Sequence, residues 1–534
     1  MAPPLSELFR ATLSVSCSKT IVIASLILGL ICVGSYLRWK RRIASYPPGP
    51  PPDPILGNAR QLVKIDNQER AFAGWERTYG DINYLSVFNK SILVLNSFSA
   101  ARDLLEKRSA IYSSRPTLVM LCEMMGWGDI LVHLQGGPKF RKHRKIIQDR
   151  FSLRALEKYA ALQRQEAYKT LLDIGNSPDD VLMHLKRFVC GVILNITYGH
   201  KVESITDPLV VNGDKATSNS VNIGGPGSLL VDLIPILKYW PAWMPFSDFK
   251  RHALYTRALV DDLMNTPYNW VKSRMAAGTA AQCIAVELLE TMNNQTGPYR
   301  EGETIDEDDV KRIAGVLYGA ATDTTGSTLA TFLLCMIRNP GVFKKAQEEI
   351  DRVIGNDRLI DYDDKDSLPY FAAVLREVLR WGCPVPLGVP HRLVEEDNYR
   401  GYVVPGGTTI LANAWAMTRN RAMYPSPDTF DPERFFGLEK MESEACQQVE
   451  AVFGFGRRIC PGRFFAESNI WVLMTNLIAT MDVGKAVDEK GREIDVTAEY
   501  VGSFVRHLKP FKCRVGYRSE KARVLVEQAN LLHN

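Results

Sequence analysis

The run from Phe453 to Gly462, FGFGRRICPG, places one cysteine between glycines and arginines. A thiolate is costly to hold unpaired in a protein interior, and cations, backbone N–H groups or a bound metal lower the pKa of its thiol. Gly456 and Gly462 permit tight turns and close backbone approach, and the guanidinium fork of Arg458 suits a carboxylate. These residue types predict a Cys460 sulfur bound to iron, with the anionic edge of a cofactor beside it.

Haem provides both partners, because it carries an iron and propionates. The run resembles the haem-binding loop of the cytochrome P450 family, F-x-x-G-x-R-x-C-x-G, whose fixed positions are all filled, by Phe453, Gly456, Arg458, Cys460 and Gly462. The resemblance implies haem b with Cys460 as the axial thiolate, the ligation that favours O–O cleavage. A buried structural cysteine in a glycine loop is the alternative, and it is favoured only for an isolated cysteine.

The stretch Ala320-Ala321-Thr322-Asp323-Thr324-Thr325 resembles the oxygen-activation segment of the same family. The resemblance implies that Asp323 and Thr324 relay protons to dioxygen. Ala321 stands where glycine is usual, and its methyl group could narrow the oxygen groove. The alternative is that the hydroxyls simply bond back to preceding backbone carbonyls.

Glu377 and Arg380 lie three residues apart, on one face of a predicted helix. On an exposed helix such a pair contributes little stability. Here it resembles the E-x-x-R pair of the family, and Pro432-Glu433-Arg434-Phe435 resembles its companion segment. The resemblance implies a buried network of Glu377, Arg380 and Arg434 that supports the cysteine loop and transfers no protons.

Two more arginines match positions that hold the haem propionates in the family. Arg144 ends a segment that resembles W-x-x-x-R, with Phe140 in place of the tryptophan, and Arg392 follows His391. A surface position is the alternative for each arginine. His143 and His391 are expected in the core or in solvent, not as iron ligands.

The bulk composition is that of a globular protein, with 534 residues, 46% of them hydrophobic, and a net charge of +5. This charge does not indicate nucleic-acid binding, and the ten scattered cysteines indicate a reduced, cytosol-facing protein. Helical periodicity dominates, with short strands near residues 87–95 and 397–412 and near the C-terminus. The fold class is therefore mainly α with small β-sheets, as the resemblance over residues 45–515 also implies. The predicted helices span residues 100–108, 153–173, 253–277, 307–338, 342–354, 370–381 and 464–481.

The N-terminal residues predict a membrane anchor. An apolar run at residues 21–37 is followed by basic residues at positions 38–42, so the rest of the chain is expected in the cytosol. We expect a short lumenal N-terminus at residues 1–19, a transmembrane anchor at 20–38, a basic and proline-rich hinge at 39–56, and a catalytic domain at 57–534. A cleaved signal peptide and a buried core helix are the alternatives.

The segment of residues 224–246 combines aromatic and aliphatic residues with prolines. It is either a loop packed on the core or an entrance region that dips into the membrane interface. Arg141, Lys142, Lys145, Arg457 and Arg463 lie near the cysteine side, where they either form a solvated face or steer an acidic redox partner.

The resemblance thus implies a haem-thiolate monooxygenase of the endoplasmic reticulum membrane, similar to secondary-metabolism members from basidiomycete fungi. It would insert one atom of dioxygen into an apolar intermediate, with a terpenoid favoured, and take electrons from a separate NADPH–cytochrome P450 reductase. The candidate lining of its substrate cavity is residues 120–130, 316, 320, 385–389 and 501–504. The alternatives are a haem-thiolate isomerase or dehydratase that does not use dioxygen, and a non-catalytic membrane-anchored haem or sterol-binding protein.

Overall fold

The computed structural model describes residues 44–88, 90–221, 230–294, 304–436, 443–502 and 504–533, together with residues 27, 30 and 34. Apart from these three positions, the predicted anchor and the segment before it lie outside the described ranges.

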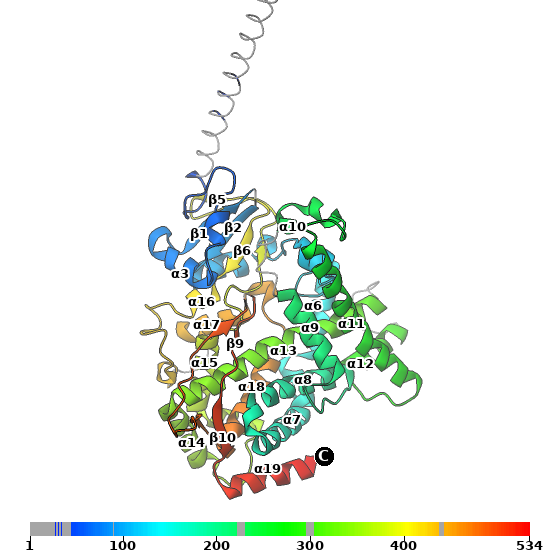
Figure 1. Ribbon diagram of the computed structural model, residues 1–534, viewed down its shortest axis with the longest axis vertical. Helices are drawn as coiled ribbons and strands as arrows, with labels where there is room; N and C mark the ends of the chain where they lie inside the picture. The colour runs from blue at the N-terminus through cyan, green and yellow to red at the C-terminus, as the bar shows by residue number, and fades with distance from the viewer. Residues whose placement is uncertain are drawn as a thin grey trace, which may run out of the picture.

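Helices make up most of the molecule, and the largest sheet lies at one end (Figure 1). The α-helices are α2 (Ala59–Leu62), α3 (Gln68–Tyr79), α4 (Phe98–Ala101), α5 (Ser109–Tyr112), α6 (Pro138–Arg150), α7 (Glu157–Asn176), α8 (Val181–Tyr198), α9 (Pro208–Val221), α10 (Leu230–Leu233), α11 (Asp248–Ala276), α12 (Ile284–Asn294), α13 (Glu307–Arg338), α14 (Pro340–Val353), α15 (Pro369–Gly382), α16 (Ala414–Met417), α17 (Glu444–Val449), α18 (Arg463–Thr480) and α19 (Glu520–His533). Two short π-helices, η1 (Arg102–Lys107) and η2 (Val119–Met124), and several 3₁₀ turns complete the helical part.

The central helix is α13, which crosses the middle of the molecule (Figure 1). It begins at a capping box formed by Asp306 and Asp309 and ends at Asn339, before Pro340. Its flanks pack against α8, α11, α15 and α18. The predicted helix at residues 307–338 is confirmed with the same bounds, because its start and stop signals are both local.

The main sheet has the strand order β1-β2-β6-β3. β1 (Ile82–Val87) and β2 (Lys90–Leu95) form the predicted hairpin, in which Val87 pairs with Lys90, and β2 runs parallel to β6 (Thr409–Ala412). β3 (His391–Arg392) pairs with the other edge of β6. The remaining strands form three small pairs: β4 (Asp397–Tyr399) with β5 (Tyr402–Val404), β7 (Met481–Lys485) with β10 (Cys513–Tyr517), and β8 (Tyr500–Val501) with β9 (His507–Leu508).

The proline-rich segment after residue 44 is packed onto this sheet. The Pro48 carbonyl accepts a hydrogen bond from the Tyr84 N–H at 2.9 Å, and the Ser45 carbonyl accepts one from Val403 at 2.8 Å. A Cβ at Gly49 would lie 1.9 Å from the Tyr84 carbonyl oxygen. Residues 45–54 of the predicted hinge therefore pack on the folded unit.

Within the described ranges, one helical segment, Pro178–Tyr198, is long and apolar enough to cross a membrane. Of its apolar window, 72% is buried, and it packs against α7 and α13. It is therefore a core helix of the folded unit.

Candidate active site

The cysteine loop runs from the 3₁₀ turn η8 (Glu450–Phe453) through η9 (Gly456–Arg458) to the start of α18. The Cys460 N–H donates to the Phe453 carbonyl at 2.7 Å, which closes the loop. Gly456 has φ +52°, and a Cβ there would lie 2.2 Å from the Leu105 carbonyl oxygen of η1. The glycine thus permits the loop to pack directly against the backbone of η1.

The Cys460 thiol is half-buried at the end of this loop. Burial raises its pKa, while the Gly462 N–H and the Arg144 guanidinium act in the opposite direction. The protein alone therefore favours the neutral thiol, and a bound cation would stabilise the thiolate. Among the described residues, no group of three or more His, Cys, Asp or Glu side chains could hold a metal ion.

Arg458 crosses from the cysteine loop to the segment before α6. Its guanidinium donates to the carbonyls of Ser113 at 2.7 Å and Leu134 at 2.7 Å, and it lies 3.7 Å from the centre of the Phe140 ring. Phe140 thus packs under the guanidinium from the position where the family motif has tryptophan. Burial lowers the pKa of Arg458 to about 10, assisted by the charge of Arg144.

Two further basic side chains lie beside Arg458. Arg115 is buried and donates to the carbonyls of Val389 and Pro390 at 2.8 and 2.7 Å. Burial lowers the pKa of His391, and the charges of Arg115 and Arg458 lower it further. Within the described ranges, neither arginine forms an ion pair with a carboxylate. This buried cation cluster fits an anionic group such as a haem propionate.

The sequence prediction named Arg392 where the structure favours its neighbour. Successive side chains of a strand point to opposite faces, and on β3 it is His391 that faces Arg115 and Arg458. Its Nδ1 bonds the Tyr112 carbonyl at 2.9 Å. Sequence reasoning also missed Arg115, because nothing local in Ser-Arg-Pro distinguishes it from a surface arginine.

Arg144, on α6, reaches the other side of the cysteine loop. Its guanidinium donates to the carbonyl of Ile459, the residue before Cys460. Burial lowers the pKa of Arg144, while Cys460 acts in the opposite direction. In this structure Arg144 therefore fixes the loop backbone next to the sulfur.

One turn of α13 is exposed beside the predicted oxygen-activation residues. Ala320 is exposed and Gly319 half-exposed in the middle of α13, although Val316 and Thr325 are buried. The Thr324 hydroxyl donates to the Ala320 carbonyl at 2.9 Å. This bond back to the helix leaves the lone pairs of the hydroxyl free to accept a hydrogen bond.

The Asp323 carboxyl faces α9, away from the exposed turn at Ala320. Burial raises the pKa of its carboxyl, and the groups around it are His507, Asp214, Lys186 and Thr217. Lys186 and Asp214 form an ion pair at 2.5 Å that is partly exposed. Asp323 therefore lies between the helix interior and a charged pair that reaches solvent.

The predicted supporting network is assembled by α15 and the turn at Pro432. Arg380 donates to both Glu377 oxygens, at 2.6 and 2.7 Å, and the Arg434 Nε lies 3.3 Å from one of them. Glu377 and Arg380 have no exposed side-chain surface. Arg380 also lies 5.3 Å from the Tyr424 ring, in an apolar cluster that contacts Phe453 at the start of the cysteine loop.

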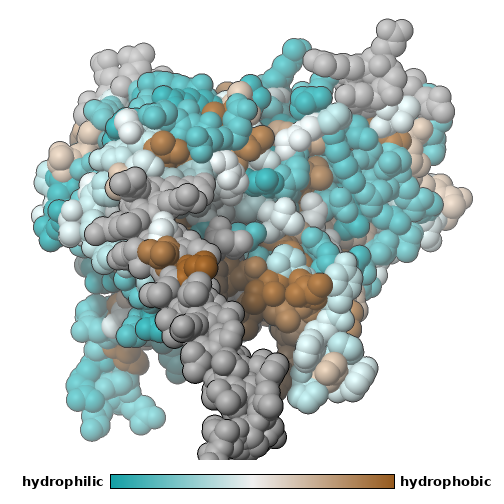
Figure 2. Space-filling model, turned by 90° about the horizontal axis from the view of Figure 1, so that it is seen from above, coloured by the Kyte–Doolittle hydropathy of each residue, from teal (hydrophilic) through white to brown (hydrophobic). Residues whose placement is uncertain are grey.

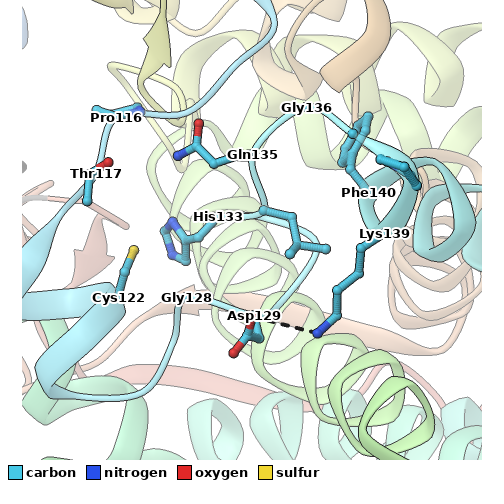
Figure 3. Close-up of a pocket in the computed structure, with 13 residues that line it drawn as sticks. Pro116, Thr117, Cys122, Gly128, Asp129, His133, Gln135, Gly136, Lys139 and Phe140 are labelled. Carbon is cyan, nitrogen blue, oxygen red and sulfur yellow. Dashed lines mark ion pairs between the residues drawn. The ribbon is translucent and has the colours of Figure 1, made fainter. Parts of the chain in front are cut away.

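A cavity of about 340 Å³ lies beside the cation cluster, between residues 116 and 140 (Figure 3). Leu134 and Phe140, which contact Arg458, form part of its wall, and Lys139 turns toward Asp129 at 3.6 Å. Cys460 is not among the residues that line this cavity.

The comparisons with known proteins agree with this arrangement. The family model described as Cytochrome P450 matches residues 47–515. Cytochrome P450 monooxygenase 176 of Postia placenta is 40% identical over 90% of this chain and 92% of its own. Cytochrome P450 monooxygenase COX2 of Coprinopsis cinerea is 34% identical, over 94% of this chain and 95% of its own, and claR of Ampulloclitocybe clavipes is 36% identical, over 95% and 93%. Every fixed position of the haem-loop motif is filled in this chain, and a buried cation cluster lies beside the loop. Together with the family model and the relatives from basidiomycete fungi, this shows that the chain belongs to the cytochrome P450 family and is a haem-thiolate monooxygenase.

Proposed function

We propose that this monooxygenase inserts one oxygen atom into a C–H bond of an apolar biosynthetic intermediate, with a terpenoid as the favoured class. The observation that carries the proposal is the exposed turn of α13 at Ala320, beside Thr324. Val316 and Leu317, within one turn before Ala320, are apolar, and apolar surroundings suit an apolar molecule.

The residues fit haem as the cofactor. Cys460 would hold the iron through Sγ, and Arg115, His391 and Arg458 would pair with the propionates, with Arg144 beside the loop and Arg392 as the sequence-predicted alternative to His391. Bound haem would supply the activation of dioxygen. Phe453 and Gly456 act through the backbone, by closing the loop and by packing it against η1.

Asp323 and Thr324 would then assist proton transfer. Burial keeps the Asp323 carboxyl protonated to higher pH than an exposed aspartate. The Thr217 hydroxyl forms a hydrogen bond with the Asp323 carboxyl, which lowers the carboxyl pKa against the effect of burial. We infer that Asp323 exchanges protons with solvent beside the Lys186–Asp214 pair, and that the Thr324 hydroxyl serves as a separate proton-delivery group at the exposed turn of α13.

The electron donor would be an NADPH–cytochrome P450 reductase that docks near the cysteine loop. Arg141 and Arg457 are exposed there and would attract an acidic partner. Lys142 is less suited to this role than its sequence position indicates, because it forms an ion pair with the buried Asp309.

The catalytic domain would lie on the cytosolic face of the endoplasmic reticulum membrane. Residues 230–246 form an ordered loop with apolar side chains turned outward: Trp243 is 82% exposed and Phe246 91%. Phe246 also has φ +61°, which is strained for a bulky side chain. Figure 2 looks onto the end of the molecule that carries α10, where brown side chains gather around a hollow. Such a surface suits a membrane interface.

The experiment that tests the proposal uses the full chain with haem and a purified reductase. Cys460→His should retain some haem but lose the red-shifted Soret band of the reduced, CO-bound form, together with product formation. Survival of that band in the variant would refute the ligand assignment. Screening terpenoid and other apolar substrates with the wild type then tests the substrate class, since only a correct class gives product in step with NADPH consumption.

A further inference from the structure

The β8–β9 hairpin lies along one polar face of α13. Asp323, Ser327 and Thr331 follow each other at intervals of four residues, which places them on the same side of the helix. The Ser327 hydroxyl donates to the Arg506 carbonyl at 2.5 Å, and the Thr331 hydroxyl lies 3.2 Å from the Tyr500 hydroxyl. Tyr500 begins the hairpin and Arg506 lies just after its turn, so the turn lies at the Asp323 end of this face.

His507 is the first residue of the returning strand β9, which contacts α13. Successive side chains of a strand point to opposite faces, and the Arg506 guanidinium stacks on the Tyr500 ring at 4.0 Å. The His507 ring therefore lies on the other face of the hairpin. It leans toward the turn, since a Cβ on Gly502 would lie 3.7 Å from the His507 Cδ2.

Titratable groups from four elements surround the Asp323 carboxyl. Burial raises the pKa of this carboxyl, and His507 of β9 is the strongest charge acting against burial. Lys186 of α8 and Asp214 of α9 also act on it, but they neutralise each other as an ion pair at 2.5 Å. The uncharged groups nearby are Thr217 of α9, Cys190 of α8 and Tyr318 of α13. Histidine is the side chain whose charge ordinarily changes near neutral pH, and His507 is the histidine among these groups.

We propose that His507 is a positioning residue for Asp323, which takes protons from solvent and passes them through one water molecule to the Asp323 carboxylate. An imidazolium N–H bond breaks, a carboxyl O–H bond forms, and the ring regains its proton from solvent. The half-exposed position of His507 gives it access to both sides of this exchange. The proposal rests on the proposed function, in which Asp323 assists proton transfer.

The first test detects the Asp323 carboxyl without turnover. Infrared difference spectroscopy follows its protonation against pH on the full chain with haem, in the reduced, CO-bound form, and loss of the band in Asp323→Asn identifies it. His507→Gln should raise the pH midpoint of this band by roughly 0.5 or more, because a positive charge that opposes protonation is removed. His507→Lys keeps that charge and should leave the midpoint close to the wild-type value.

The second test measures the product formed per NADPH consumed between about pH 6 and 8, with a purified reductase. His507→Gln should lower this ratio roughly twofold or more. His507→Lys should lower it equally, because a lysine ammonium does not release its proton in this range. The matched control is His252→Gln on α11, a half-buried histidine bonded to the Asn219 carbonyl at 2.9 Å, which should change neither result.

The two tests separate the charge of His507 from its proton. An unchanged Asp323 band in His507→Gln overturns the proposal, and so does a wild-type product ratio in His507→Lys, since charge alone would then be sufficient. His507→Asn, which is smaller and equally uncharged, takes the place of the glutamine variant if that protein lacks the normal CO-bound spectrum. A wild type that consumes NADPH without forming product would instead contradict the proposed function, and the infrared band would still test the pairing of His507 with Asp323.

Discussion

Replacing Glu377 by glutamine removes the only negative charge from the network beneath the cysteine loop. The carboxylate accepts bonds from two Arg380 nitrogens, from the Arg434 Nε and from the Asp431 N–H. An amide keeps one acceptor oxygen and turns N–H donors toward two cations. Arg380 would then be fully buried without a counter-charge.

The loss of one partner from a buried ion pair costs about 3–5 kcal/mol. We expect the lower end, about 3 kcal/mol, because Arg380 keeps its bonds to the Thr418 and Pro427 carbonyls. This corresponds to roughly a 100-fold change in the unfolding equilibrium. The matched control is Glu348→Gln on α14, whose contact with Lys344 is 3.9 Å and exposed, and which should cost less than about 1 kcal/mol.

The assay is urea unfolding of the two variants and the wild type under identical conditions, followed by circular dichroism and by the haem band. A chain of this length need not unfold in one step, so the midpoints of the two variants are compared directly. The haem band of Glu377→Gln should fade first, because the Arg380–Tyr424 cluster supports Phe453. Equal midpoints for Glu377→Gln and Glu348→Gln would refute the buried-charge argument.

Four further results are expected. Thr324→Ala should keep haem and ligand binding but lower the product formed per NADPH consumed, and an unchanged ratio would move the proton relay elsewhere. Gly456→Ala should prevent normal loop packing, because its Cβ would lie 2.2 Å from the Leu105 carbonyl, and should yield protein with little haem; normal haem content would contradict this. Burial raises the pKa of Asp309, but bonds from His143 and Lys142 outweigh it, so the pKa is lowered in the folded state. The stability that Asp309 contributes is therefore present above the unfolded pKa of about 3.9 and lost as pH falls below it, and Asp309→Asn should flatten the acid side of a stability–pH curve. Asn294, exposed at the end of α12 in an N-glycosylation sequon, should stay unmodified in a eukaryotic host if the domain faces the cytosol, and a glycosidase-sensitive gel shift that disappears on Asn294→Gln would place it in the lumen.

Local patterns were sufficient for the motifs and for several of the long helices, such as α7, α11, α13 and α18. The bounds of α13 follow from a capping box at one end and Asn339-Pro340 at the other. The spacing of Glu377 and Arg380 places both on one helix face, so their contact follows from helix geometry. The helix predicted at residues 100–108 is divided into α4 and the π-helix η1, and α8, η2 and α19 are among the helices that were not predicted. π-Helices have no periodicity of their own in a short apolar stretch.

The sequence by itself identified the candidate residues for the chemistry: Cys460 in its loop, Thr324 in its helix, and the Glu377 pair. Only the tertiary structure decided which side chains meet. It brought Arg115 and His391 to Arg458 from separate segments of the chain, and it joined Trp127 to Ser220. Contacts within one turn of a helix are fixed by backbone geometry, whereas contacts between distant segments depend on how whole helices pack, and no local spacing records that.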